Sequence, residues 1–136
     1  MEKIYSKIEP DRLLHIIYRL DEFNGRQELV PADNFIQCSS LKMQEGKTFP
    51  PHKHIKKNRH YAEQIAQESW IVLKGSVQCI FYDLDDTIIA KPILYFGDSS
   101  FTLGGGHTYI ILEDDTLVYE YKTGPYEGQA LDKTFI

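Results

Sequence analysis

Two histidines one residue apart and a glutamate that opens an apolar run are the residues of this sequence best suited to chemistry. His52 and His54 follow Pro50-Pro51, which favours extended backbone, and on an extended strand both imidazoles point to the same face. Imidazoles placed in this way can bind one metal ion from adjacent positions. Taken alone, the pattern is also compatible with an ordinary loop, since the chain contains five histidines.

Glu68 and His107 each stand at the start of an apolar run. If 68–73 is one strand, Glu68 shares its face with Trp70 and Val72, where an unpaired carboxylate is costly and needs a cation. His107 follows three consecutive glycines, which let the backbone turn sharply and place a histidine at a strand start. The alternative for both residues is a strand end that faces solvent.

The elements that must position these residues are short strands. The chain has 136 residues, of which 42% are hydrophobic and 26% charged, and it is rich in Tyr (9) and Phe (7), which favours one all-β domain. Short apolar runs between turn residues predict an antiparallel sandwich or barrel. The runs cover residues 13–20, 35–43, 70–73, 77–82, 87–89, 93–96, 109–112 and 116–121.

Three stretches between these runs predict turns. Lys74-Gly75 predicts a tight hairpin between the runs 70–73 and 77–82, because glycine supplies a positive φ. The acidic stretch 83–86 lacks the spacing of a calcium loop and predicts a solvated turn. Residues 59–67 lack strand formers and predict a single helical turn.

Charge, cysteine usage and hydropathy exclude several classes of protein. A formal charge of −5 argues against a nucleic-acid partner. Cys38 and Cys79 form no CxxC motif, so a thiolate zinc site is not expected, and burial in a reducing compartment fits both residues. No stretch approaches the ~20 apolar residues of a membrane span. We therefore expect a cytoplasmic protein with no membrane partner.

Five residues in order resemble the first motif of the cupin superfamily. They are Gly46, His52, His54, Glu68 and Gly75. The segment 55–67, between the second histidine and the glutamate, is longer than in the usual pattern, so the choice of Glu68 rests on its spacing to Gly75. His60 and Glu63 lie within this segment and are alternative ligands.

Two further stretches extend the resemblance. Residues 97–107 are loosely similar to the second cupin motif, with Thr102 at the usual proline position, His107 as the third histidine and Ile111 at the usual asparagine. The segment 118–126 looks like the C-terminal tail of the WbuC-type cupin metalloproteins, which are found with bacterial surface-polysaccharide genes. The similarity runs roughly from residue 35 to residue 126.

The resemblance implies a single-domain cupin, a double-stranded β-helix or jelly-roll barrel with short helical turns. The barrel would span residues 35–126, with N-terminal strands at 1–34 and a tail at 127–136. Small cupins commonly pair, so a homodimer is expected, with the N-terminal strands as a candidate part of its interface.

The resemblance also implies a metal site. Its ligands would be His52, His54, Glu68 and His107, and its ion zinc, iron, manganese or nickel. Trp70, Gln78 and Tyr109 are candidate pocket residues around it.

The function implied is action on a sugar or nucleotide-sugar intermediate, as an isomerase or epimerase. No residue stands out as a general base, so the catalytic residues stay unassigned. Two alternatives remain: a non-catalytic module that binds a sugar-like or anionic small molecule, and a dioxygenase if the metal is ferrous iron.

Overall fold

The structure, a computed structural model, describes residues 1–42, 44–52, 65–123 and 134–136. Over these residues the chain is all-β, as predicted, with one short 3₁₀ turn, η1 (Leu20–Glu22). No helix in the described ranges is long and apolar enough to cross a membrane. The strands are β1 (Glu2–Tyr5), β2 (Leu13–Tyr18), β3 (Arg26–Glu28), β4 (Ser39–Leu41), β5 (Glu68–Lys74), β6 (Val77–Tyr82), β7 (Ile88–Ala90), β8 (Ile93–Leu94), β9 (Ser99–Thr102), β10 (Gly106–Ile111) and β11 (Leu117–Lys122).

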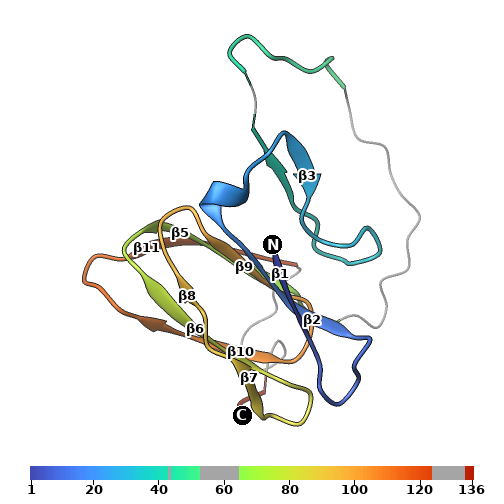
Figure 1. The fold of residues 1–136 in the computed structure, drawn as a ribbon, viewed down its shortest axis with the longest axis vertical. Helices are drawn as coiled ribbons and strands as arrows, with labels where there is room; N and C mark the ends of the chain where they lie inside the picture. Colours follow the sequence, from blue (N-terminus) through green and yellow to red (C-terminus); the bar gives the residue numbers. More distant parts are fainter. Residues whose placement is uncertain (43, 53–64, 124–133) are drawn as a thin grey trace.

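Antiparallel pairing joins these strands into three sheets. The large sheet has the order β1-β2-β9-β5-β11, and the small sheet has the order β10-β6-β7, with β8 also paired to β6. Strands β3 and β4 form a separate two-stranded hairpin. The predicted N-terminal segment 1–34 thus contributes β1 and β2 to the large sheet, where β2 pairs with β9. Figure 1 shows the large and small sheets facing each other.

The main core lies between the large and small sheets. Strand β6 buries every second residue, and Val77, Cys79 and Phe81 are all fully buried. They pack against Ile17 and Val72 of the large sheet. The predicted burial of Cys79 is confirmed, and removal of this apolar surface from water holds the two sheets together.

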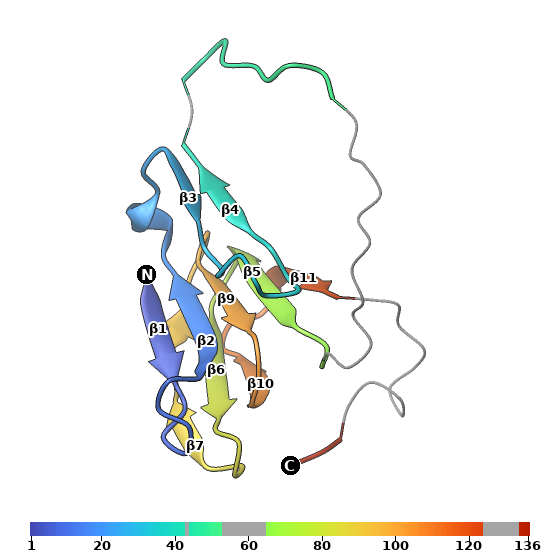
Figure 2. The same ribbon diagram turned by 90° about the vertical axis from the view of Figure 1, so that its right-hand side faces the viewer.

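A second core covers part of the opposite face of the large sheet. Ile16, Tyr18 and Phe101 of that sheet pack against Leu29 and Val30, which follow β3. Figure 2 shows the β3–β4 hairpin extending from this side. Strand β9 therefore lies in the middle of three layers, and all four of its residues are buried.

The predicted hairpin between residues 70–73 and 77–82 is wrong in its pairing. Gly75 has the expected positive φ of 78°. However, β5 pairs with β9 and β11, whereas β6 pairs with β10, β7 and β8. The inward residues of the two strands, such as Val72 and Val77, pack in one core, so the turn leads the chain from one sheet to the other.

The predicted solvated turn at 83–86 is also wrong at its first residue. Asp83 is fully buried and accepts hydrogen bonds from the Ser6 hydroxyl (2.5 Å) and from the amides of Lys7 (2.6 Å) and Leu84 (2.8 Å). Burial opposes the charge of Asp83, but these hydrogen bonds outweigh it and lower the pKa of the carboxyl group. The carboxylate therefore ties the N-terminal segment to the end of β6.

Candidate functional site

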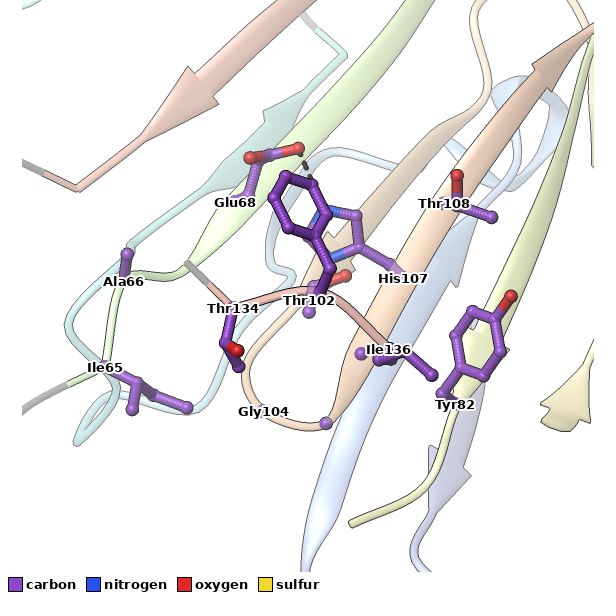
Figure 3. A pocket seen from close by; sticks show the side chains of 13 residues that line it. Ile65, Ala66, Glu68, Tyr82, Thr102, Gly104, His107, Thr108, Thr134 and Ile136 are labelled. Carbon is purple, nitrogen blue, oxygen red and sulfur yellow. Dashed lines mark hydrogen bonds and ion pairs between the residues drawn. The ribbon is translucent and has the colours of Figure 1, made fainter. Parts of the chain in front are cut away.

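Glu68 and His107 meet between the two main sheets. Glu68 is the first residue of β5 in the large sheet, and His107 is the second residue of β10 in the small sheet. The His107 Nε2–H donates to Glu68 Oε1 at 3.1 Å, and only 12% of the glutamate side chain and 25% of the histidine side chain are exposed. Figure 3 shows the contact at the wall of a cavity. Two donor groups far apart in the sequence thus share one partly buried position.

Two aromatic residues support this pair. The Trp70 Nε1–H donates to Glu68 Oε1 at 3.0 Å and to the Glu120 carboxylate at 3.2 Å. The Trp70 ring stacks on Tyr109, with centroids 4.0 Å apart and an angle of 11° between the planes. The His107 ring lies at a tilt against the same Tyr109, at 5.4 Å. The structure therefore places two of the three predicted pocket residues beside Glu68 and His107.

The third predicted pocket residue, Gln78, lies on the other face of the small sheet. Residues alternate between faces along β6, and Cys79, next to Gln78, points into the core. Gln78 pairs with Ile110, whereas Cys79 pairs with Tyr109, the residue that stacks on Trp70. A shift in register by one residue would move Gln78 to the opposite face of the strand. In the register that the strands adopt, Gln78 points away from the space between the sheets.

His52 is not brought to the pair. It lies exposed in the segment 44–52, which Figures 1 and 2 show extending away from the two main sheets. Its Nδ1–H donates to the Pro50 carbonyl at 3.0 Å. In the described part of the chain, no three residues of the types His, Cys, Asp and Glu are grouped closely enough to hold one ion.

The other predicted ligands lie outside the described residues. These are His54 and the alternatives His60 and Glu63. The predicted helical turn at 59–67 falls there too, except for its last three residues, which have no regular structure. Of the four predicted ligands, the structure brings together Glu68 and His107.

The pair borders a cavity of about 570 Å³. Its walls come from the starts of β5 and β10, the end of β9, the glycine loop 104–106 and residues 134–136. Gly105 has a φ of 69°, and a Cβ at this position would lie 2.4 Å from the Tyr82 carbonyl oxygen. A side chain there would push the loop off β6, so the cavity depends on glycine at this position.

Sequence reasoning missed His15, a fully buried histidine of β2 behind the cavity wall. Its ring stacks on Phe81 at 4.2 Å, and its Nδ1 and Nε2 lie 3.3 Å from the Thr102 hydroxyl and 3.4 Å from the Tyr82 carbonyl. Burial lowers the pKa of His15 from 6.5 to about 4, so the ring is neutral at pH 7. The available signal was a polar residue within the apolar run 13–20.

Comparison with known proteins adds no relative. No family model matches the sequence, and neither curated proteins nor solved structures gave a match. The fold and the site define the class: an all-β protein of facing antiparallel sheets with an acid–imidazole pair at an inter-sheet cavity.

Proposed function

We propose that this chain is a cupin-like metalloprotein that holds a divalent ion at Glu68 and His107. The observation that carries the proposal is their Oε1–Nε2 distance of 3.1 Å across the two sheets. Two ligand atoms in neighbouring positions, each about 2.1 Å from one ion, lie about 3 Å apart. The pair therefore has the spacing of two adjacent ligands before any ion is bound.

The donor types also fit such an ion. One carboxylate and neutral imidazoles suit zinc, iron, manganese or nickel, with His52 and His54 completing the set expected from the cupin resemblance. Only a deprotonated Nε2 can bind a metal, so the ion would replace the hydrogen that His107 now donates to Glu68. When bound with an open position, such an ion polarises a carbonyl oxygen or lowers the pKa of water.

The reaction proposed is isomerisation or epimerisation of a sugar or nucleotide-sugar intermediate of bacterial surface-polysaccharide synthesis. A cavity of about 570 Å³ lies within the range of about 300–1,000 Å³ typical of small-molecule sites. In this chain, Trp70 orients the Glu68 carboxylate, and the sheets on either side limit access of water to the pair. The resemblance to the WbuC-type tail is what points to polysaccharide chemistry.

A non-catalytic binding module is the second candidate. It is favoured by the hydrogen bond between Glu68 and His107, which satisfies both side chains without an ion. Equilibrium binding of a sugar with no turnover would support this candidate. Oxygen uptake by the iron-loaded protein would instead reveal the dioxygenase alternative.

The same proposal includes three further features: the two main sheets form a closed jelly-roll barrel, the protein is a homodimer, and it is located in the cytoplasm. The facing of the two main sheets supports the barrel. Exposed apolar residues on β11, an edge strand of the large sheet, support a contact between two copies; they are Leu117, Tyr119 and Tyr121.

Metal analysis of matched variants tests the proposed site. We expect about one ion per chain in the untreated protein, and at least a tenfold loss of metal affinity in Glu68→Gln and in His107→Gln, because the first removes the negative charge of the carboxylate and the second removes the imidazole nitrogen. Glu120→Gln is the control, since Glu120 contacts the same Trp70 nitrogen but is not a proposed ligand. Elemental analysis and metal titration provide the measurement.

Two results would contradict this proposal. One is a protein that takes up none of the four metals when they are supplied. The other is unchanged affinity in both ligand variants, since the ion would then lie elsewhere.

A further inference from the structure

Residues 134–136 form one wall of the cavity, and this wall is held differently from the others. Most of the remaining walls belong to β5, β6, β9 and β10, which hydrogen-bonded pairing holds in the two main sheets. No hydrogen bond or ion pair joins residues 134–136 to the other parts of the chain that the structure describes. Phe135 and Ile136 are 80% and 63% exposed, so only a small apolar contact holds this wall in place.

That contact is nevertheless a defined one. Gly106, the first residue of β10, pairs with Tyr82 of β6, and its missing side chain leaves a notch beside the Tyr82 side chain. A Cβ at Gly106 would lie 2.3 Å from the Cδ1 of Ile136 and 3.2 Å from the Cβ of Tyr82. Figure 3 shows Ile136 next to Tyr82. The notch at Gly106 is therefore the seat of the Ile136 side chain.

A side chain seated there brings residues 134–136 close to the Glu68–His107 pair. His107 follows Gly106 directly in the chain, and it lines the same cavity as Thr134 and Ile136 (Figure 3). The walls formed by strands cannot open without breaking the pairing of the sheets. The wall formed by residues 134–136 opens when one side chain leaves its seat, which is a local change of low free-energy cost.

We propose that residues 134–136 are a displaceable strap that restricts access to Glu68 and His107 while Ile136 is seated at Gly106. A ligand or ion then reaches the pair when Ile136 leaves the notch. As regulation of the proposed metal site, this inference rests on the proposed function. The seat itself is formed without an ion, so access can be measured on the metal-free chain.

Chemical modification of His107 measures that access. Diethyl pyrocarbonate acylates unprotonated imidazole nitrogens that it can reach, and mass spectrometry of peptides gives the rate at each histidine. The full chain is treated with a chelator first, so that no ion blocks the ring. Ile136→Ser removes most of the apolar contact at the seat and should raise the rate at His107 by about three- to fivefold, because the strap is open in more of the molecules.

Internal references and a matched variant separate the strap from general loosening of the fold. His52 is exposed and lies away from the sheets, so its rate should not change, and the fully buried His15 should stay unreactive. Ile88→Ser is the control variant. Ile88 is also an exposed isoleucine of the small sheet, but it does not line the cavity, so the rate at His107 should stay as in the parent.

Gly106→Ala tests the seat from the opposite side. Gly106 does not have a positive φ, so the backbone of β10 tolerates alanine, whereas the added methyl group would displace Ile136. The rate at His107 should rise as it does in Ile136→Ser. Combined with Ile136→Ser, the alanine should add little, because the side chain that it displaces has already been removed. A full additional rise would contradict the seat.

Three further results would overturn the inference. They are an unchanged rate at His107 in Ile136→Ser, an equal rise in Ile88→Ser, and a parallel rise at His15, which would indicate opening of the whole fold. Added zinc separates this inference from the proposed function. If the ion site is correct, zinc protects His107 in the parent and in Ile136→Ser, whether or not the strap limits access. If zinc gives no protection, the ion site is wrong, and the difference between the two chelator-treated proteins still tests the strap.

Discussion

At the scale of single residues, the site depends on aromatic side chains that hold the Glu68 carboxylate in one orientation. Glu68 Oε1 accepts hydrogen bonds from both Trp70 (3.0 Å) and His107 (3.1 Å). The stacking of Trp70 on Tyr109 fixes the indole in turn. A partly buried carboxylate held by two donors keeps one orientation, which is what a metal or ligand site requires.

The buried His15 should make the protein less stable in acid. Its pKa falls from 6.5 to about 4, mainly because burial removes water from the ring and also because of the charge of His107; the Tyr82 carbonyl and Asp83 act in the opposite direction. Above pH 6.5 the ring is neutral in the folded and unfolded states. Between pH 6.5 and about 4 only the unfolded chain binds the proton, so the free energy of unfolding falls by about 3 kcal/mol as pH falls.

Urea unfolding of the parent and of His15→Gln at several pH values measures this effect. Glutamine can donate to the Tyr82 carbonyl and accept from Thr102 without titrating. We expect the stability of the parent relative to the variant to shrink by about 3 kcal/mol between pH 7 and pH 4. Parallel curves for the two proteins would show that His15 binds its proton equally in both states.

At the scale of elements, the connections that pass between the sheets determine where the strands lie. The β5–β6 turn packs against the β10–β11 turn, since a Cβ on Gly75 would lie 2.3 Å from Thr116 Oγ1. The Thr116 hydroxyl donates to the Glu113 carbonyl at 2.7 Å within the second turn. Both turns are therefore fixed by the same contact.

Gly75→Ala should destabilise the fold more than Gly25→Ala. Both glycines have positive φ, 78° and 62°, which costs an alanine about 1–2 kcal/mol. A Cβ at Gly25 meets nothing within 4 Å, whereas one at Gly75 meets Thr116. Denaturant midpoints should show an additional loss of at least about 1 kcal/mol for Gly75→Ala. Equal losses of stability in the two variants would mean that the β5–β6 turn can move away from Thr116 at no cost in free energy.

The sequence predicted those strands in which the spacing of apolar residues indicates the buried face. Residues 77–82 alternate between the core and the outer face, and the run that begins at Leu13 is strand β2. Strand β9 was missed because three of its four residues are Ser or Thr, and they are buried. Ser100 and Thr102 are satisfied by Tyr109 and His15, partners that no local pattern reveals.

The candidate site was likewise predicted only in part. Glu68 and His107 each begin an apolar strand, which suggested that both point inward, and the structure brings them into contact. Gln78 could not be placed, because a register difference of one residue decides its face. The segment 44–52 carries no apolar pattern that would fix His52 against either sheet.

At the scale of the whole molecule, the predicted ligands come from three separate parts of the chain. Glu68 belongs to the large sheet and His107 to the small sheet, so packing of the core brings them together. His52 belongs to the segment 44–52, which lies away from both sheets (Figure 1). Binding of an ion by all of them therefore requires this segment to move toward the cavity.

Hydrogen exchange should detect that movement. Addition of zinc or nickel should slow amide exchange in peptides covering 44–52, because a bound His52 restricts the backbone around it. His52→Ala, with metal bound through the remaining ligands, should show no such protection and should bind the ion at least tenfold more weakly. The strand β7 (Ile88–Ala90), distant in sequence from every predicted ligand, serves as the internal reference. Unchanged exchange at 44–52 with metal bound would contradict His52 as a ligand. Glu68 and His107 would then hold the ion without His52, because the two sheets position these two residues independently of the segment 44–52.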